Sequence, residues 1–176
     1  MRKSADLERE AALSVAELMA SAARTAPKTR GIDNIEVFAI DDEPTKAKLA
    51  AKMREMSASE KRPSLERDAN SIANSPTILV IGVRSNPAGL NCGFCGYKTC
   101  EELKSSGGVC AYNSIDLGIA ISSAASIASQ FHVDNRVMYS IGLASIELNF
   151  FSKDVKQALG IPLSVTGKNP FFDRKI

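Results

Sequence analysis

The sequence predicts a single domain, residues 1–176, of the α/β or α+β class, with helices layered on a sheet. A chain of 176 residues is in the usual range for one domain and buries enough surface to fold without disulfides. Segments rich in β-branched residues alternate with segments of helical periodicity, which is the pattern of a layered domain. The apolar run Thr77–Val83 is typical of a strand buried on both faces.

Four elements are expected before this strand. Apolar residues recur at helical spacing from Leu7 to Ala22 and predict an amphipathic helix over residues 5–25, which Pro27 ends. Residues 35–40 alternate and predict a strand, and the turn at 41–44 leads into a helix. Two helices are expected to carry apolar residues on one face: Leu49, Met53 and Met56 in the first, and Leu65, Ala69 and Ile72 in the second.

After the buried strand the pattern predicts a loop and then mostly helices. Ser114 is expected to be the N-cap of a helix with Asp116 in its first turn. Nine of the twelve residues from 118 to 129 are glycine, alanine or serine, so we expect this helix to be the central, buried one. The remaining elements are predicted, in order, as a strand over 136–141, a helix over 143–150 and a last helix over 153–160, closed by Gly160 and Pro162.

All four cysteines lie in the segment 84–112, between the buried strand and the helix that follows: Cys92, Cys95, Cys100 and Cys110. Thiolates are ligands of zinc and of iron–sulfur clusters. Gly93 and Gly96 follow the first two cysteines and can take the positive φ that a tight turn around a shared centre demands. The four cysteines therefore predict a metal or cluster site.

Two helix starts are expected to face this site. The segment Thr99–Glu102 fits a capping box, which predicts a short helix from Cys100. Cys110 lies shortly before the next helix. Because the N-terminus of a helix carries partial positive charge, both starts would stabilise an anionic centre.

Composition argues against several classes of protein. Lys and Arg number 22 against 20 Asp and Glu, without a basic block, so nucleic acid is not an expected partner. The longest uncharged stretch, residues 117–131, is short for a membrane span, and acidic residues soon after Met1 interrupt any signal peptide. We therefore expect a cytoplasmic protein without a membrane partner, in which clustered cysteines are ligands rather than disulfides.

The run Cys92-Gly-Phe-Cys95-Gly-Tyr-Lys-Thr-Cys100 resembles the C-G-x-C-G-x3-C signature of a small four-iron, four-sulfur domain in electron-transport subunits and corrinoid iron–sulfur proteins. That resemblance implies a [4Fe–4S] cluster, with Cys110 as fourth ligand, although the domain usually carries its fourth cysteine farther along the chain. Two other interpretations of the cysteines stay open: a structural zinc site, and thiols or a redox disulfide without metal.

A second resemblance covers most of the chain. Six segments are similar to segments of nitroreductases, the last of them to a late helix of that family: 22–27, 35–40, 46–53, 75–81, 114–120 and 155–162. This implies a nitroreductase-like fold with FMN at a homodimer interface. Its phosphate would be held by basic side chains, for which the candidates are Arg24, Lys28, Arg30 and Lys168. The alternative for this basic segment is a solvated turn that caps the C-terminal end of the first helix.

The whole pattern, including the end Gly167–Arg174, resembles a family of uncharacterised bacterial and archaeal proteins that contain a ferredoxin domain. The predicted function is electron transfer or redox sensing through a [4Fe–4S] cluster, with an unknown redox partner. One alternative is an oxidoreductase in which the cluster feeds FMN. The other is a structural zinc module without a redox role.

Overall fold

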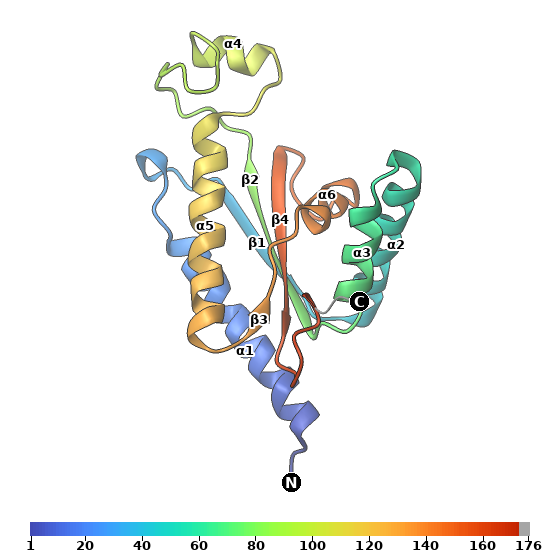
Figure 1. The fold of residues 1–176 in the computed structure, drawn as a ribbon. Helices are drawn as coiled ribbons and strands as arrows, with labels where there is room; N and C mark the ends of the chain where they lie inside the picture. The colour runs from blue at the N-terminus through green and yellow to red at the C-terminus, as the bar shows by residue number, and fades with distance from the viewer. Residues whose placement is uncertain (173–176) are drawn as a thin grey trace.

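The computed structural model describes residues 1–172 and arranges them in three layers, with a sheet between two groups of helices (Figure 1). The sheet is antiparallel and has four strands in the order β1-β2-β4-β3. The strands span β1 Ile35–Ile40, β2 Thr77–Arg84, β3 Asp134–Asn135 and β4 Val155–Ser164. The predicted class, helices layered on a sheet, is confirmed.

The central strand β2 is buried on both faces, as its sequence predicts. Leu79, Ile81 and Val83 belong to a core shared with α1 (Ser4–Thr25) and α5 (Ala111–Gln130). Ile78 and Val80 belong to a second core shared with α2 (Glu43–Glu60), α3 (Pro63–Ile72) and α6 (Tyr139–Glu147). Since successive side chains of a strand point to opposite faces, one short apolar run supports both helical layers.

The first half of the chain follows its sequence pattern closely. The helix predicted over 5–25 is α1, whose buried side is made of small and medium apolar residues such as Ala12, Val15 and Met19. The predicted strand over 35–40 is β1. Asp42 is the N-cap of α2, where its side chain accepts a hydrogen bond of 2.8 Å from the backbone N–H of Thr45.

The second half departs from the prediction at its last elements. Residues 153–160, predicted as a helix, fall largely within β4, and the resemblance of 155–162 to a late helix was therefore wrong. Within the predicted strand 136–141 lies instead the start of α6 at Tyr139. Gly160 and Pro162, taken as helix-ending residues, lie in β4 and pair with Val80 and Ile78. Burial between two helical layers decides the conformation of this segment, and a local pattern does not contain that information.

The helix α5 is not the central buried element that its small residues suggested. Ala120, Ala124 and Ala128 are buried in the core shared with α1, but the opposite side of the helix is exposed. It begins at Ala111 with Cys110 as N-cap, so Ser114 is not its cap, and the hydroxyl of Ser114 donates instead to Gln157 Oε1 at 2.7 Å. None of the helices within residues 1–172 is long and apolar enough to cross a membrane.

Candidate metal centre

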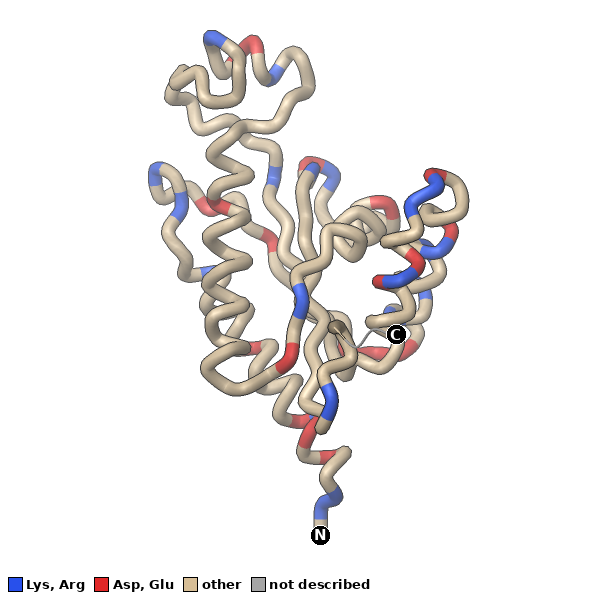
Figure 2. Tube along the Cα trace, in the orientation of Figure 1, with Lys and Arg blue, Asp and Glu red and all other residues tan. Residues whose placement is uncertain are grey.

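The cysteine loop, residues 84–112, leaves the end of β2 and returns at the first turn of α5. Figure 1 shows it standing beyond one end of the sheet, with the short helix α4 (Cys100–Ser105) within it. Charged side chains of both signs occur along this loop, as Figure 2 shows for the whole trace. The loop therefore projects from the layered core instead of forming part of it.

All four cysteines line one hollow inside this loop: Cys92, Cys95, Cys100 and Cys110. The hollow is small, with a volume of about 10 Å³, and is partly open to solvent. All four are free thiols, and their exposure falls from Cys92, which is exposed, to Cys110, which is 5% exposed. The structure thus brings together side chains that lie up to eighteen positions apart in the sequence.

The turn between the first two cysteines depends on glycine. Gly93 and Gly96 have φ values of 75° and 85°, and the backbone N–H of Gly96 donates to the carbonyl oxygen of Gly93 at 2.9 Å. A Cβ atom at either position would meet nothing within 4 Å, so the positive φ, and not lack of space, requires glycine here. This confirms the conformation predicted from the sequence.

Cys100 is held by a reciprocal pair of contacts with Asn91. The backbone N–H of Asn91 points at the sulfur of Cys100, with a distance of 3.4 Å between N and Sγ. The backbone N–H of Cys100 donates to Asn91 Oδ1 at 2.7 Å. Asn91 has a φ of 47°, a conformation that asparagine tolerates better than most residues. The role of Asn91 could not be predicted from the sequence, because only the folded loop places this residue opposite a cysteine nine positions later.

Both predicted helix starts lie at cysteines. The capping box of α4 is present: the N–H of Glu102 donates to Thr99 Oγ1 at 3.1 Å, and the N–H of Thr99 donates to Glu102 Oε2 at 3.4 Å. Cys100 is therefore the first residue of α4, and Cys110 is the N-cap of α5. The positive ends of two helices lie at the hollow, which suits a negatively charged group bound there.

A ring stack ties the two ends of the cysteine loop together. The rings of Phe94 and Tyr112 lie nearly parallel, with centroids 5.6 Å apart and 15° between their planes. Phe94 lies between the first two cysteines, and Tyr112 follows the fourth by two residues. Phe94 is 68% exposed and does not line the hollow, whereas Tyr112 does, so the stack places an apolar ring at the surface beside the hollow.

Three polar contacts anchor the base of the loop to the domain. The buried Asn113 accepts the backbone N–H of Asn86 at 3.2 Å through its Oδ1. Lys156 Nζ donates to the carbonyl oxygen of Gly107 at 2.8 Å, and Arg30 Nη1 donates to that of Ala88 at 2.8 Å. These contacts hold the outgoing and returning segments in register, so that Cys110 lines the same hollow as the three other cysteines.

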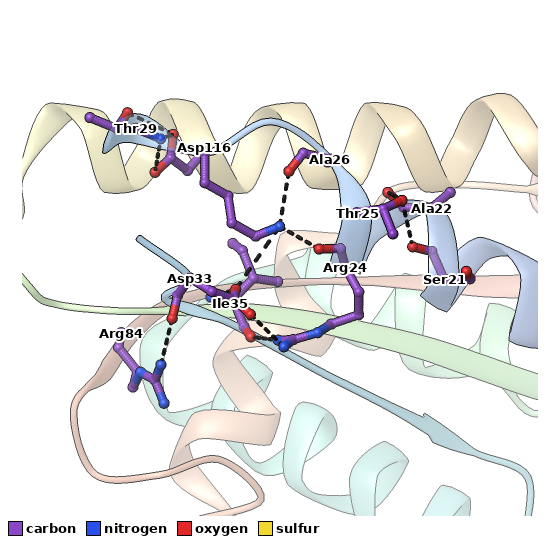
Figure 3. Close-up of polar contacts among 11 residues, drawn as sticks. Ser21, Ala22, Arg24, Thr25, Ala26, Thr29, Asp33, Ile35, Arg84 and Asp116 are labelled. Atoms are coloured by element: carbon purple, nitrogen blue, oxygen red, sulfur yellow. Dashed lines mark hydrogen bonds and ion pairs between the residues drawn. The ribbon is translucent and has the colours of Figure 1, made fainter. Parts of the chain in front are cut away.

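The basic side chains proposed to hold a flavin phosphate do not form one site. Figure 3 shows the guanidinium of Arg24 against Asp33 and the carbonyl oxygen of Ile35. Lys28 Nζ donates to the carbonyl oxygens of Arg24 and Ala26, the latter at 2.9 Å, and so caps the end of α1. These contacts are those expected of the alternative interpretation, a basic turn at a helix C-terminus.

The other two candidate basic residues lie apart from this turn. Arg30 donates to the carbonyl oxygen of Ala88 in the cysteine loop. Lys168 follows β4, whose residue Leu163 pairs with Thr77, whereas Ile35 pairs with Val83 at the other end of β2. At about 3.3 Å per residue, these two ends of the sheet are about 20 Å apart.

Asp116 joins α5 to the turn after α1. Its carboxylate accepts the backbone N–H of Thr29 at 3.0 and 3.2 Å and the Thr29 hydroxyl at 2.8 Å (Figure 3). The side chain is 4% exposed. Its role is to position the turn. The prediction that Asp116 lies in the first turn of the helix was wrong, because α5 begins at Ala111 and Asp116 is its sixth residue.

Replacing Asp116 with asparagine is expected to lower the free energy of unfolding by about 2 kcal/mol, because a hydrogen bond to a charged group is lost. Thr29→Val removes only the hydroxyl contact and should cost about 1 kcal/mol. Urea denaturation followed by circular dichroism measures both. Equal stability of the wild type and Asp116→Asn would contradict the positioning role.

The four thiols surround the hollow without converging on a point. Within the part of the chain that the structure describes, no three His, Cys, Asp or Glu side chains are grouped so that they could hold one metal ion. Tetrahedral zinc with Zn–S bonds of about 2.3 Å would bring the sulfurs to about 3.8 Å from one another. The four thiols would therefore have to move closer together to bind a single zinc ion.

Comparison with known proteins gives the family. An uncharacterized protein from Archaeoglobus fulgidus is 40% identical over 178 residues, which cover 96% of this chain and 95% of the relative. A family model described as "Uncharacterized protein containing a ferredoxin domain" (DUF2148) matches residues 106–174. The chain belongs to this family. The matched range includes Cys110 and begins after the three other cysteines, so the ferredoxin-domain family assignment does not depend on the run Cys92–Cys100.

Solved structures agree on the fold of this ferredoxin-domain protein. A nitroreductase with bound FMN from Desulfitobacterium hafniense superposes with a TM-score of 0.62 at 14% identity, covering 88% of this chain and 78% of that one. A BluB-like flavoprotein from Clostridium difficile gives a TM-score of 0.59 at 16% identity, covering 89% and 81%. At this identity the similarity establishes the nitroreductase-like fold, which confirms the predicted scaffold.

Proposed function

We propose that this protein binds a [4Fe–4S] cluster through Cys92, Cys95, Cys100 and Cys110 and uses it for electron transfer or redox sensing. The observation that carries the proposal is the single hollow lined by all four cysteines. Membership of a family described as containing a ferredoxin domain supports the same role. A cluster of this kind supplies a one-electron redox couple whose potential depends on its surroundings.

The loop offers three ways to tune such a group. The N–H of Asn91 points at the sulfur of Cys100, and hydrogen bonds to sulfur stabilise the more negative, reduced state. The starts of α4 and α5 act in the same direction through their dipoles. The buried position of Cys110 limits access of water to that ligand.

The zinc alternative has less support. Four thiolates are a common zinc ligand set, so the ligand types alone do not distinguish a zinc site from a cluster site. The run Cys92–Cys100 resembles a cluster-binding signature and the family is described as containing a ferredoxin domain, and both favour a cluster over zinc.

A flavin-dependent reductase is a second candidate, favoured by one observation: the fold is shared with a nitroreductase that binds FMN. The residues of this chain do not supply the phosphate site proposed from its sequence, since Arg24, Lys28 and Arg30 donate to backbone carbonyl oxygens and Lys168 lies at the other end of the sheet. We therefore derive no step through FMN.

The visible absorption of anaerobically purified protein tests the proposal. A [4Fe–4S] protein is brown, with a broad band near about 400 nm from thiolate-to-iron charge transfer that bleaches on addition of dithionite. Resolved flavin peaks would favour the reductase instead. A colourless protein that contains one zinc per chain would favour the structural module and would contradict the proposal.

Asn91→Gly is expected to weaken retention of the cluster about tenfold, since loss of a group that orients a ligand typically costs tenfold or more in affinity. Glycine keeps the positive φ of this position and the N–H to sulfur but removes the oxygen that holds the backbone of Cys100. The rate of iron release to a chelator measures the effect. Lys104→Ala, an exposed change in α4, is the control, and equal release rates from both variants would contradict the role of Asn91.

A further inference from the structure

A second hollow adjoins the cysteine loop at its base. It lies between α5, α6 and β4 and has a volume of about 330 Å³. This is at the lower end of the range of small-molecule sites, which suits a ligand of one or two rings. Its walls include three leucines on three different elements: Leu117 on α5, Leu143 on α6 and Leu159 on β4.

The polar groups around these walls favour an anion. Lys156, Gln157 and Ser114 line the hollow together with Tyr139, and no acidic side chain is among the lining residues. Tyr139 is also the first residue of α6, which has no side-chain cap, so the positive end of that helix lies on this side of the hollow. An apolar interior with a cation and amide at its edge is typical of sites for small organic anions.

Gly118 widens the hollow on the side of α5. It lies in the middle of α5, where glycine costs about 1 kcal/mol relative to alanine. A Cβ at this position would meet nothing within 4 Å, so packing within residues 1–172 gives no reason for glycine. Gly118 lines the hollow, and its missing side chain leaves the space above the helix open.

A residue that lines the hollow also contacts the cysteine loop. Lys156 donates to the carbonyl oxygen of Gly107 in the loop, and Ser114 lies one helical turn, about 6 Å, after Cys110. A molecule bound here would therefore lie next to the candidate metal centre without contacting the cysteines themselves.

We propose that this hollow, lined by Leu117, Gly118, Leu143, Lys156, Gln157 and Leu159, binds a small ring compound that carries an anionic oxygen group. The rings lie against the leucines over Gly118, and the oxygens face Lys156 and Gln157. The site is formed by α5, α6 and β4, so its existence does not depend on the nature of the metal centre.

Isothermal titration calorimetry with 2-naphthoate tests the site. This probe has two rings and a carboxylate and does not react with thiols. We expect the wild type to bind it with a dissociation constant of about 1 mM, the affinity usual for a ligand of this size. Gly118→Leu fills the space over the helix and should weaken binding at least tenfold, and Lys156→Gln should weaken it several-fold.

Two controls keep the test decisive. Ser122→Leu places the same side chain on the exposed side of α5, one turn beyond the hollow, and should leave binding unchanged. Loss of fold does not explain a defect of Gly118→Leu, because leucine has a higher helix propensity than glycine and the position is open. Metal-free Cys95→Ala protein should bind as the wild type does, which separates this site from the metal centre. No binding by the wild type, or equal binding by wild type and Gly118→Leu, would overturn the proposal.

Discussion

Replacing Cys95 with alanine is expected to remove nearly all bound iron while leaving the fold intact. Cys95 is one of four thiols around a single hollow, and a cluster that loses one of its four ligands is bound more weakly and is more open to attack by solvent. The two hydrophobic cores lie in the helices and the sheet, and neither contains Cys95. Iron content after anaerobic purification should fall at least tenfold, and the far-ultraviolet circular dichroism should stay that of the wild type.

Lys98→Ala is the matched control for this variant. Lys98 is an exposed residue of the same loop, three positions after Cys95, and its side chain does not line the hollow. Its iron content should equal that of the wild type. Wild-type iron in Cys95→Ala would exclude this residue as a ligand, and loss of iron from both variants would show that the loop tolerates no change.

Replacing Gly142 with alanine is expected to destabilise the protein by about 3 kcal/mol or more, the upper range for overpacking in a core. Gly142 lies where α6 meets β4. An ideal Cβ there would lie 1.7 Å from the carbonyl oxygen of Ala158 and 2.8 Å from the backbone nitrogen of Leu159. These are backbone atoms that no rotamer change can move, so the helix must shift away from the strand. Thermal unfolding should show a Tm about 6–12 °C lower.

Replacing Gly118 with alanine should stabilise the protein, whereas the same replacement at Gly142 should destabilise it. Both glycines lie within helices, but a Cβ at Gly118 meets nothing within 4 Å. Gly118→Ala should therefore raise the free energy of unfolding by about 1 kcal/mol, through helix propensity alone. Two changes of opposite sign would confirm the packing at the α6–β4 contact. A stable Gly142→Ala protein would show that α6 lies farther from β4.

Several parts of the fold could be predicted because their signals are local. The β-branched run in β2, the apolar spacing of α1 and the capping box at Thr99 each lie within a few neighbouring residues. The same holds for the turn glycines Gly93 and Gly96, whose position beside cysteines already indicates their conformation. The family resemblances added the layered scaffold, which no local pattern contains.

The elements that were predicted wrongly depend on distant contacts. β4 carries a glycine and a proline that usually end helices, yet it pairs with β2 and is covered on both faces. The serines and alanines of α5 indicated close packing, which occurs against α1 on one side only. In both cases the tertiary surroundings decide which of two locally acceptable structures forms.

At the candidate site, too, the residues with local signals could be predicted, and those that depend on contacts between distant residues could not. Its cysteines could be named from their spacing, but Asn91 and Asn113 could not, because their contacts join residues that only the folded loop brings together. The basic residues near the end of α1 looked like a phosphate site by resemblance. In the structure Arg24 and Lys28 donate to nearby backbone carbonyl oxygens, an arrangement that a sequence pattern does not distinguish from a ligand site.

The cysteine loop projects from the layered core, which would place a bound redox group near the surface. The cysteine loop is fastened at its base by Asn113, Lys156 and Arg30, while the layered core supplies stability. A redox group in this loop would be close to the surface, with the exposed ring of Phe94 beside it, as electron exchange with a partner requires.

Quantification of iron and acid-labile sulfide in anaerobically purified protein tests the central claim most directly. We expect about four of each per chain, in protein whose absorption bleaches with dithionite. One zinc per chain with no sulfide, or fully reduced thiols with no metal after anaerobic purification and reconstitution with iron and sulfide, would contradict it.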